Sequence, residues 1–205
     1  MVERWHEINN HVFAAVYSGT CWGHPTGCDF ANVPGGYAYL AKICNMWRLY
    51  SDITDVYSSG VGNPAGFSDI ARYWALKQDE LAPWNGPGHW NDPDMLEIGN
   101  QGLWGAKENL TIPERRSHMA LWCIFAAPLI LGGDVRTLSE GDLAIVSNPH
   151  LIRINQDKMG TQGRCIRGCP RPAAAQAWAA TSMANFTAAK GTPAVALNVT
   201  IHSSV

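Results

Sequence analysis

The chain has 205 residues, of which 46% are hydrophobic and 16% are charged, and its formal net charge is −2. This composition is typical of a globular protein that can bury a sizeable core, and it excludes an intrinsically disordered chain. No run of lysine and arginine exceeds two residues and no apolar stretch is long enough to cross a bilayer. The sequence therefore argues against nucleic-acid binding, binding to an anionic membrane surface and a transmembrane span.

Helical and strand patterns alternate along most of the chain. A helix at 1–10 precedes an apolar run at 11–18 that fits a buried parallel strand, and a loop rich in glycine and proline follows. Hydrophobic spacing predicts further helices at 37–45, 67–80, 113–126, 139–147 and 149–154, and further strands at 46–51, 89–96 and 128–132. This alternation predicts a parallel sheet with crossover helices. From about residue 165 the sequence becomes rich in alanine and threonine, and alternating apolar residues at 194–201 indicate an antiparallel sheet.

Residues 86–99, Gly-Pro-Gly-His-Trp-Asn-Asp-Pro-Asp-Met-Leu-Glu-Ile-Gly, form the most informative motif. Two carboxylates, Asp92 and Asp94, flank Pro93, whose fixed φ and missing N–H stiffen the backbone. Trp90 precedes them. Acidic and aromatic groups on a rigid turn suit a sugar, which offers hydroxyl groups to carboxylates and apolar C–H faces to indole. The alternative is a turn in which the aspartates cap nearby backbone N–H groups.

The motif closely resembles the signature of glycoside hydrolase family 27, the retaining α-galactosidases and α-N-acetylgalactosaminidases. Residues 90–96 match the seventh strand of the family's barrel without a gap. Three other segments also resemble the family. Residues 44–53 are similar to the sixth strand, 117–136 to the seventh helix with the eighth strand, and 154–163 to the exit from the barrel. The resemblance covers about residues 1–165.

This resemblance implies an α/β fold with two parts. Residues 1–160 would form the C-terminal half of a (β/α)8 TIM barrel, strands five to eight, and residues 161–205 the beginning of a C-terminal antiparallel β-sandwich domain. The family's nucleophilic aspartate lies on strand four, in a Lys-aromatic-Asp-x-Cys motif that this sequence lacks. We therefore expect a fragment of a larger enzyme that supplies the acid/base but not the nucleophile, and that is inactive alone.

The resemblance also implies roles for individual residues. Asp52, at the C-terminal end of strand six, matches the catalytic acid/base. The residues implied to contact the substrate are Arg48, Trp22, Asp94 and Met95. Those implied to support them are Trp90 and Asp92. From the residues alone, Asp52 reads as a helix N-cap, Arg48 as a partner in a surface ion pair, and Trp90 as core packing.

The implied activity is hydrolysis of terminal α-linked galactose from an oligosaccharide, glycolipid or glycoprotein glycan, with no cofactor and no metal. The loop at 18–28, which faces the sugar's 2-substituent in the family, fits neither the galactosidase nor the N-acetylgalactosaminidase pattern. An α-N-acetylgalactosaminidase, another family specificity and a non-catalytic homologue therefore stay open as alternatives. A homodimer of the complete enzyme is compatible with the resemblance.

The six cysteines lie at 21, 28, 44, 123, 165 and 169. Zinc is disfavoured because only Cys165 and Cys169 are close in sequence, and they lack a second pair. The resemblance implies a disulfide from Cys44 to Cys21 or Cys28, while the apolar surroundings of Cys123 predict a buried thiol. Three sequons permit glycosylation, at Asn109, Asn185 and Asn198. We expect an oxidising compartment, secreted or lysosomal/vacuolar, with a signal segment outside this chain.

Overall fold

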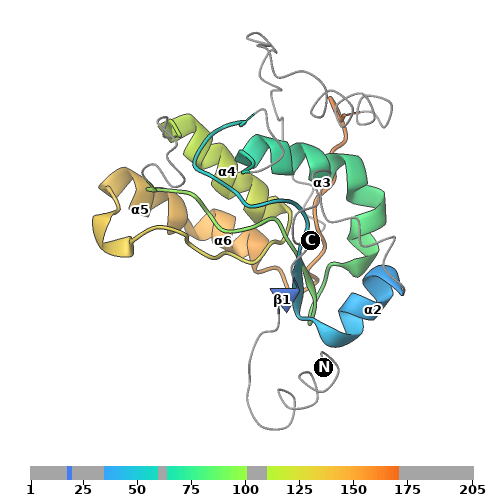
Figure 1. The fold of residues 1–205 in the computed structure, drawn as a ribbon. Helices are drawn as coiled ribbons and strands as arrows, with labels where there is room; N and C mark the ends of the chain where they lie inside the picture. The colour runs from blue at the N-terminus through green and yellow to red at the C-terminus, as the bar shows by residue number, and fades with distance from the viewer. Residues whose placement is uncertain (1–17, 20–34, 60–63, 101–109, 171–205) are drawn as a thin grey trace.

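The computed structural model describes residues 18–19, 35–59, 64–100 and 110–170 (Figure 1). The helix at 1–10, the strand at 194–201, almost all of the strand at 11–18 and the asparagines of all three glycosylation sequons lie outside these residues. Of the predicted β-sandwich part, 161–205, the described residues include only 161–170.

A small parallel sheet lies at the centre of the described structure. Its strands are β1 (Ser18–Gly19), β2 (Met46–Arg48) and β3 (Trp90–Asp92), in the order β1-β2-β3. Both pairs of neighbours are parallel, with Ser18 opposite Met46 and Arg48 opposite Asp92. Helix α2 (Gly36–Ile43) lies between the first two strands in sequence, and α3 (Phe67–Leu81) with the short η2 (Ala82–Trp84) lies between the second two. The predicted alternation of parallel strands with helices is therefore confirmed here.

The predicted strand at 89–96 is interrupted after Asp92. Pro93 has no N–H to donate, and Asp94 takes a left-handed backbone conformation with φ +85°. Pairing resumes at Leu96, whose N–H donates to Ile130 at 2.7 Å and whose carbonyl accepts from Gly132 at 3.0 Å. This parallel bridge is all that the structure forms of the predicted strand at 128–132.

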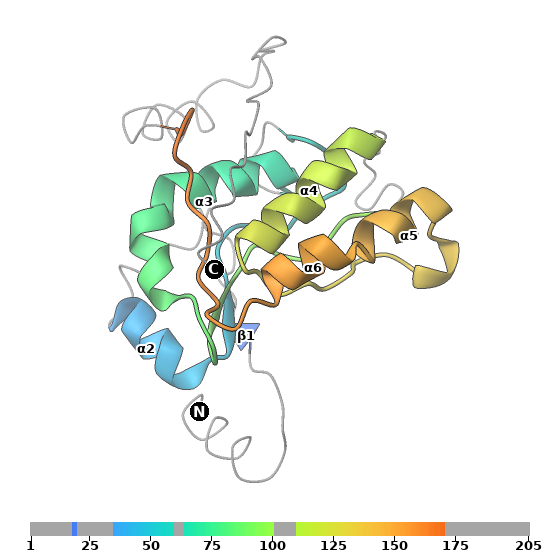
Figure 2. The ribbon, with the colours of Figure 1, turned by 180° about the vertical axis from the view of Figure 1, so that it is seen from behind.

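The remaining helices form a layer beside the sheet. They are α4 (Ile112–Ile124), η4 (Val135–Thr137), α5 (Glu140–Val146) and α6 (Pro149–Asn155). Helix α4 packs against α3, α5 and α6, as the two opposite views show (Figures 1 and 2). Polar side chains cap α5 and α6: the Ser139 hydroxyl accepts the Asp142 N–H at 3.1 Å, and the side-chain oxygen Oδ1 of Asn148 accepts two N–H groups of α6. None of the described helices has the length and apolar character needed to span a membrane.

Aromatic rings join α3 to α4. Trp74 stacks on Phe125 with ring centroids 4.1 Å apart, and His118 stacks on Phe67 at 5.1 Å. His118 is completely buried, and burial lowers its pKa to about 3. Neither ring nitrogen of His118 has a hydrogen-bond partner among the described residues. This histidine is therefore a neutral core residue.

The cysteines differ from expectation at two places. Cys165 and Cys169 form a disulfide, which the sequence analysis did not predict. The predicted disulfide from Cys44 is not formed in this structure: the Cys44 thiol is free and buried, and Cys21 and Cys28 lie outside the described residues. Cys123 is the buried free thiol that was predicted, and burial raises its pKa to about 12.

Candidate active site

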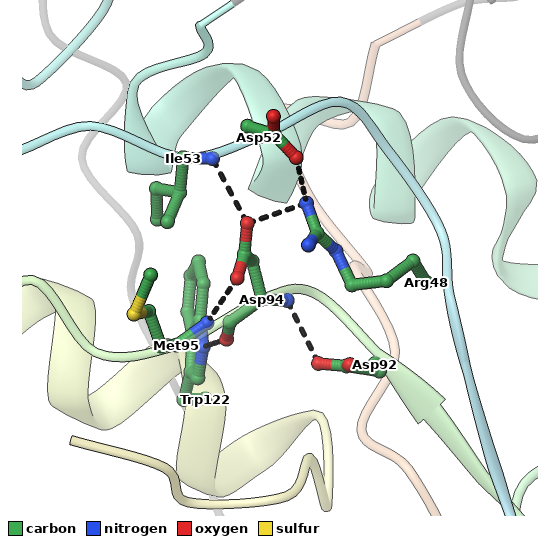
Figure 3. Close-up of polar contacts among 7 residues, drawn as sticks. All are labelled: Arg48, Asp52, Ile53, Asp92, Asp94, Met95 and Trp122. Carbon is green, nitrogen blue, oxygen red and sulfur yellow. Dashed lines mark hydrogen bonds and ion pairs between the residues drawn. The ribbon is translucent and has the colours of Figure 1, made fainter. Parts of the chain in front are cut away.

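The C-terminal ends of β2 and β3 bring one guanidinium and three carboxylates together (Figure 3). Arg48 ends β2 opposite Asp92, which ends β3, and the N–H of Leu49 continues the pairing by donating to the Asp92 carbonyl at 2.9 Å. Asp52 follows Arg48 by four residues, and Asp94 follows Asp92 by two. Parallel strands place their carboxyl ends at one edge of the sheet, so side chains from two distant segments meet there.

Arg48 is shared between two carboxylates that differ in exposure. Its Nη2 lies 3.3 Å from Asp52 Oδ1 and forms an ion pair with Asp94 Oδ2. The Asp94 side chain is 10% exposed, whereas the Asp52 side chain is 64% exposed. The guanidinium therefore links a buried carboxylate to one that solvent can reach.

Hydrogen bonds fix both the side chain and the backbone of Asp94. Its carboxylate accepts the N–H of Ile53 at 2.9 Å through Oδ2 and that of Met95 at 2.8 Å through Oδ1. Its own N–H donates to Asp92 Oδ1 at 2.9 Å, and its carbonyl accepts the indole N–H of Trp122 at 2.6 Å. Asp92 thus stabilises the turn at residues 92–94, and Asp94 has the most polar contacts of the three aspartates around Arg48.

Burial raises the pKa values of three carboxyl groups in this region, those of Asp92, Asp94 and Glu97. The pKa of Asp92 rises to about 6 through burial, although the Asp94 N–H and the Arg48 guanidinium oppose the shift. Burial also raises the pKa of Asp94 against the Arg48 charge. The pKa of Glu97 rises to about 7, because burial dominates and the charges of Asp55 and Asp94 add to it. The carboxyl groups of Asp92 and Glu97 therefore keep their protons to a higher pH than ordinary carboxyl groups do.

Of the other predicted site residues, the structure describes Met95 and Trp90 but not Trp22. Met95 follows Asp94 and lies next to Gly132, where an added Cβ would lie 2.5 Å from the Met95 sulfur. Trp90 begins β3, and its outer ring packs beside Gly160, where an added Cβ would lie 2.7 Å from it. Trp90 therefore makes packing contacts, whereas Trp22 lies outside the described residues. No group of three or more His, Cys, Asp or Glu side chains in the described ranges could hold a metal ion.

Two contributors to the site were missed by the sequence analysis. They are the indole of Trp122, which comes from α4, and the backbone N–H of Ile53. A backbone donor leaves no trace in a residue pattern. Trp122 lies in the segment that resembles the family, but its spacing from Asp94 shows no contact between them.

Comparison with known proteins identifies the family of the chain. A family model described as alpha galactosidase A matches residues 6–157. The chain belongs to glycoside hydrolase family 27. Its homologues are glycoside hydrolases, so the segment is part of a glycosidase fold.

The following relatives are much longer than this chain. Human alpha-N-acetylgalactosaminidase is 46% identical over 145 residues, which are 68% of this chain and 32% of that enzyme. Human alpha-galactosidase A is 36% identical over 150 residues, 70% of this chain and 32% of that protein. A Bacteroides fragilis crystal structure grouped with the alpha-galactosidases aligns with a TM-score of 0.65 and 33% identity, covering 82% of this chain and 34% of that one. The chain spans about a third of its relatives, and its parallel strands correspond to part of a TIM barrel.

Proposed function

We propose that this chain supplies the acid/base side of the active site of a retaining exo-α-glycosidase that releases terminal α-linked galactose. Asp52 is the general acid/base in this proposal. The residues that contact the sugar are Arg48, Asp94, Met95 and Trp22, and those that support them are Asp92 and Trp90. The substrates would be α-galactoside oligosaccharides, glycolipids or glycoprotein glycans.

The difference in exposure between Asp52 and Asp94 carries this assignment. A general acid must reach the glycosidic oxygen of a substrate that arrives from solvent. Asp52 is the exposed carboxylate of the three that lie around Arg48, at the strand edge where barrel enzymes place their chemistry. After Asp52 gives up its proton, the guanidinium 3.3 Å away stabilises the carboxylate that forms.

The nucleophile comes from outside this sequence in this mechanism. A retaining glycosidase places its two carboxyl groups about 5–5.5 Å apart and passes through a covalent glycosyl-enzyme intermediate. The first product should therefore keep the α configuration. Proton NMR of fresh product tests this, and early appearance of the β anomer would contradict it.

A specificity for α-linked N-acetylgalactosamine is the second candidate. It is favoured by the higher identity to human alpha-N-acetylgalactosaminidase, 46% against 36% for human alpha-galactosidase A. The loop at 18–28, which would contact the sugar's 2-substituent, lies outside the described residues.

A chimera tests the role of Asp52. Residues 6–157 of this chain would replace the matching segment of human alpha-N-acetylgalactosaminidase, which retains its own remaining barrel. Asp52→Asn should lower turnover of a disaccharide at least a hundredfold, because acid assistance typically contributes 10²–10⁴-fold. A nitrophenyl glycoside, whose leaving group needs no proton, should lose least in the first step.

Asp134→Asn is the matched control, since Asp134 is also an exposed carboxylate beside an arginine, Arg136, and both residues lie within the grafted segment. Near-normal turnover of the disaccharide by the Asp52→Asn chimera would remove Asp52 from the chemistry. The ratio of activity on nitrophenyl α-galactoside to that on nitrophenyl α-N-acetylgalactosaminide decides between the two specificities.

We also propose that the protein works in an oxidising compartment, secreted or lysosomal/vacuolar, and that the complete enzyme is a homodimer. The disulfide between Cys165 and Cys169 supports the choice of compartment, because disulfides are rare in the reducing cytosol.

A further inference from the structure

Three tryptophans of the described core are almost completely buried but use their indole N–H groups differently. Trp47, Trp74 and Trp122 are 0%, 1% and 0% exposed. Trp47 donates to the side chain of Asn91 at 2.9 Å, whereas the Trp74 N–H has no partner among the described residues. Trp122 donates to the main-chain carbonyl of Asp94 at 2.6 Å. One of these three indoles therefore binds the backbone of a site residue.

The backbone of Asp94 needs to be held. Its φ of +85° lies in the left-handed region, which is unfavourable for residues other than glycine although aspartate tolerates it better than most. From this conformation the carboxylate reaches both the Ile53 N–H and the Arg48 guanidinium. The Trp122 bond fixes the carbonyl on the other side of the same residue, so it restrains the peptide that sets the direction of the side chain.

The indole of Trp122 is itself fixed in place. The edge of the His118 ring meets it with centroids 4.1 Å apart and planes at 74°, and Phe125 lies at 6.1 Å. Both neighbours belong to the region where α4 packs on α3. The donor is therefore part of a rigid aromatic core rather than a side chain that can turn away.

We propose that Trp122 is a positioning residue of the glycosidase site: its N–H holds Asp94 in the left-handed conformation that points the carboxylate at Arg48. This rests on the proposed function for its catalytic consequence. Helix α4 thereby determines, through the Trp122 indole, how Arg48 is presented to Asp52 and to a sugar.

Hydrogen exchange of the whole chain tests the structural step without any activity. Trp122→Phe removes the N–H while keeping an aromatic ring, and Trp74→Phe is the matched control because Trp74 is equally buried and contacts the same Phe125. The Ile53 amide, bonded to Asp94, should exchange about tenfold faster in Trp122→Phe than in Trp74→Phe. Equal exchange rates in the two variants would overturn the proposal.

A measurement on the unmodified chain covers the case in which Trp122→Phe does not fold. The indole N–H of Trp122 should exchange with solvent more slowly than that of Trp74, because only the former is hydrogen-bonded while both are buried. Equal indole exchange would show that the Asp94 bond does not form, and would overturn the proposal.

Activity of the chimera separates this proposal from the proposed function. Trp122→Phe should lower kcat/KM about tenfold or more, while Trp74→Phe should lower the melting temperature but leave kcat/KM unchanged. If Asp52→Asn abolishes activity and both tryptophan variants behave alike, positioning by Trp122 is wrong and the proposed function stands. If Asp52→Asn is active, the proposed function fails while the exchange experiment still decides the role of Trp122.

Discussion

Glu97 shows what burial does to a single carboxyl group. It lies three residues beyond Asp94 and is 1% exposed. The Asn100 amide donates to one of its oxygens, and the other has no partner among the described residues. With the negative charges of Asp55 and Asp94 adding to the cost of burial, the pKa rises from 4.5 to about 7. Glu97 therefore binds a proton in the folded chain at pH values where the unfolded chain has lost it.

Glu97→Gln should raise stability more at high pH than at low pH. Between pH 4.5 and 7 the folded wild type binds more protons than the unfolded chain, so its free energy of unfolding falls as pH rises. The free energy of unfolding of the glutamine variant does not fall in this way. Relative to wild type it should rise by up to about 1.4 kcal/mol per pH unit across that window. Urea unfolding at pH 4.5 and pH 8 measures the gain.

The exposed Glu140→Gln is the control for this measurement, and a Glu97→Gln profile parallel to wild type would contradict the prediction. Wild type must be compared at each pH because His118 acts in the opposite direction. Its pKa of about 3 in the folded chain lies below the usual 6.5, so the histidine lowers stability as pH falls from 6.5 to 3.

Gly132→Ala should disturb substrate binding more than stability. The added methyl group would meet the flexible end of Met95, at 2.5 Å from its sulfur, and the methionine can move away at little cost. In the active chimera we expect KM to rise about threefold to tenfold with the melting temperature within a few degrees of wild type. Gly141→Ala in α5, where the methyl group has room, is the control. An unchanged KM would place Met95 outside the sugar site.

At the scale of elements, one buried asparagine joins three parts of the barrel segment. Asn91 lies in β3, and its amide donates to the Leu81 carbonyl at 3.0 Å and to the Gln162 side chain at 3.1 Å. Its side-chain oxygen accepts the Trp47 indole, and its N–H donates to the Asn85 side chain at 2.7 Å. The network fixes β3 against β2 and against the end of α3, just below the carboxylates.

Asn91→Ala should be strongly destabilising. It leaves the Trp47 indole and the Leu81 carbonyl buried without their partner, and each such group costs about 1–3 kcal/mol. We expect a loss of roughly 3 kcal/mol or more in urea unfolding. Asn148→Ala, which removes the partly exposed cap of α6, should cost about 1 kcal/mol. Similar losses in the two variants would mean that the network adds nothing beyond ordinary hydrogen bonding.

Helices and strands were predicted with unequal success. The described α-helices begin and end within two residues of the predicted ranges, because apolar spacing, caps and prolines act within one segment, whereas the short η2 and η4 were not predicted. The strands are shorter than predicted, since pairing depends on a neighbour as well as on apolar character. At 89–96 the decisive fact was local: Pro93 and the left-handed Asp94 end β3 after Asp92.

At the scale of the whole molecule, the segment at 129–132 has one edge without a paired strand among the described residues. Leu96 covers one side of the segment at 129–132, and no described strand pairs with its other side. Ile130 is 48% exposed there. Exposed strand edges with apolar side chains favour pairing with another chain. We therefore expect this chain, expressed alone, to self-associate and to lack α-galactosidase activity.

Ile130→Lys should weaken that self-association. A lysine opposes pairing through its charge, and the loss of an isoleucine side chain that self-association would bury should raise the dissociation constant about tenfold. Sedimentation velocity over a range of concentrations measures it. Val135→Lys is the control, since Val135 is more exposed but lies in η4 and not beside a strand. A monomeric wild type that hydrolyses an aryl α-galactoside would contradict both expectations.

The sequence by itself determined the family, the alternation of parallel strands with helices and the residues that meet at the strand edge. Arg48, Asp52 and Asp94 were predicted to share a site, and the structure brings them within reach of one another. These conclusions depend on local motifs and on the rule that parallel strands end at one edge. Only the tertiary structure decided that Asp94 is buried while Asp52 is exposed, and that Trp122 reaches the Asp94 carbonyl. Burial and hydrogen bonding between distant segments depend on how the helices pack on the sheet, which no single segment encodes.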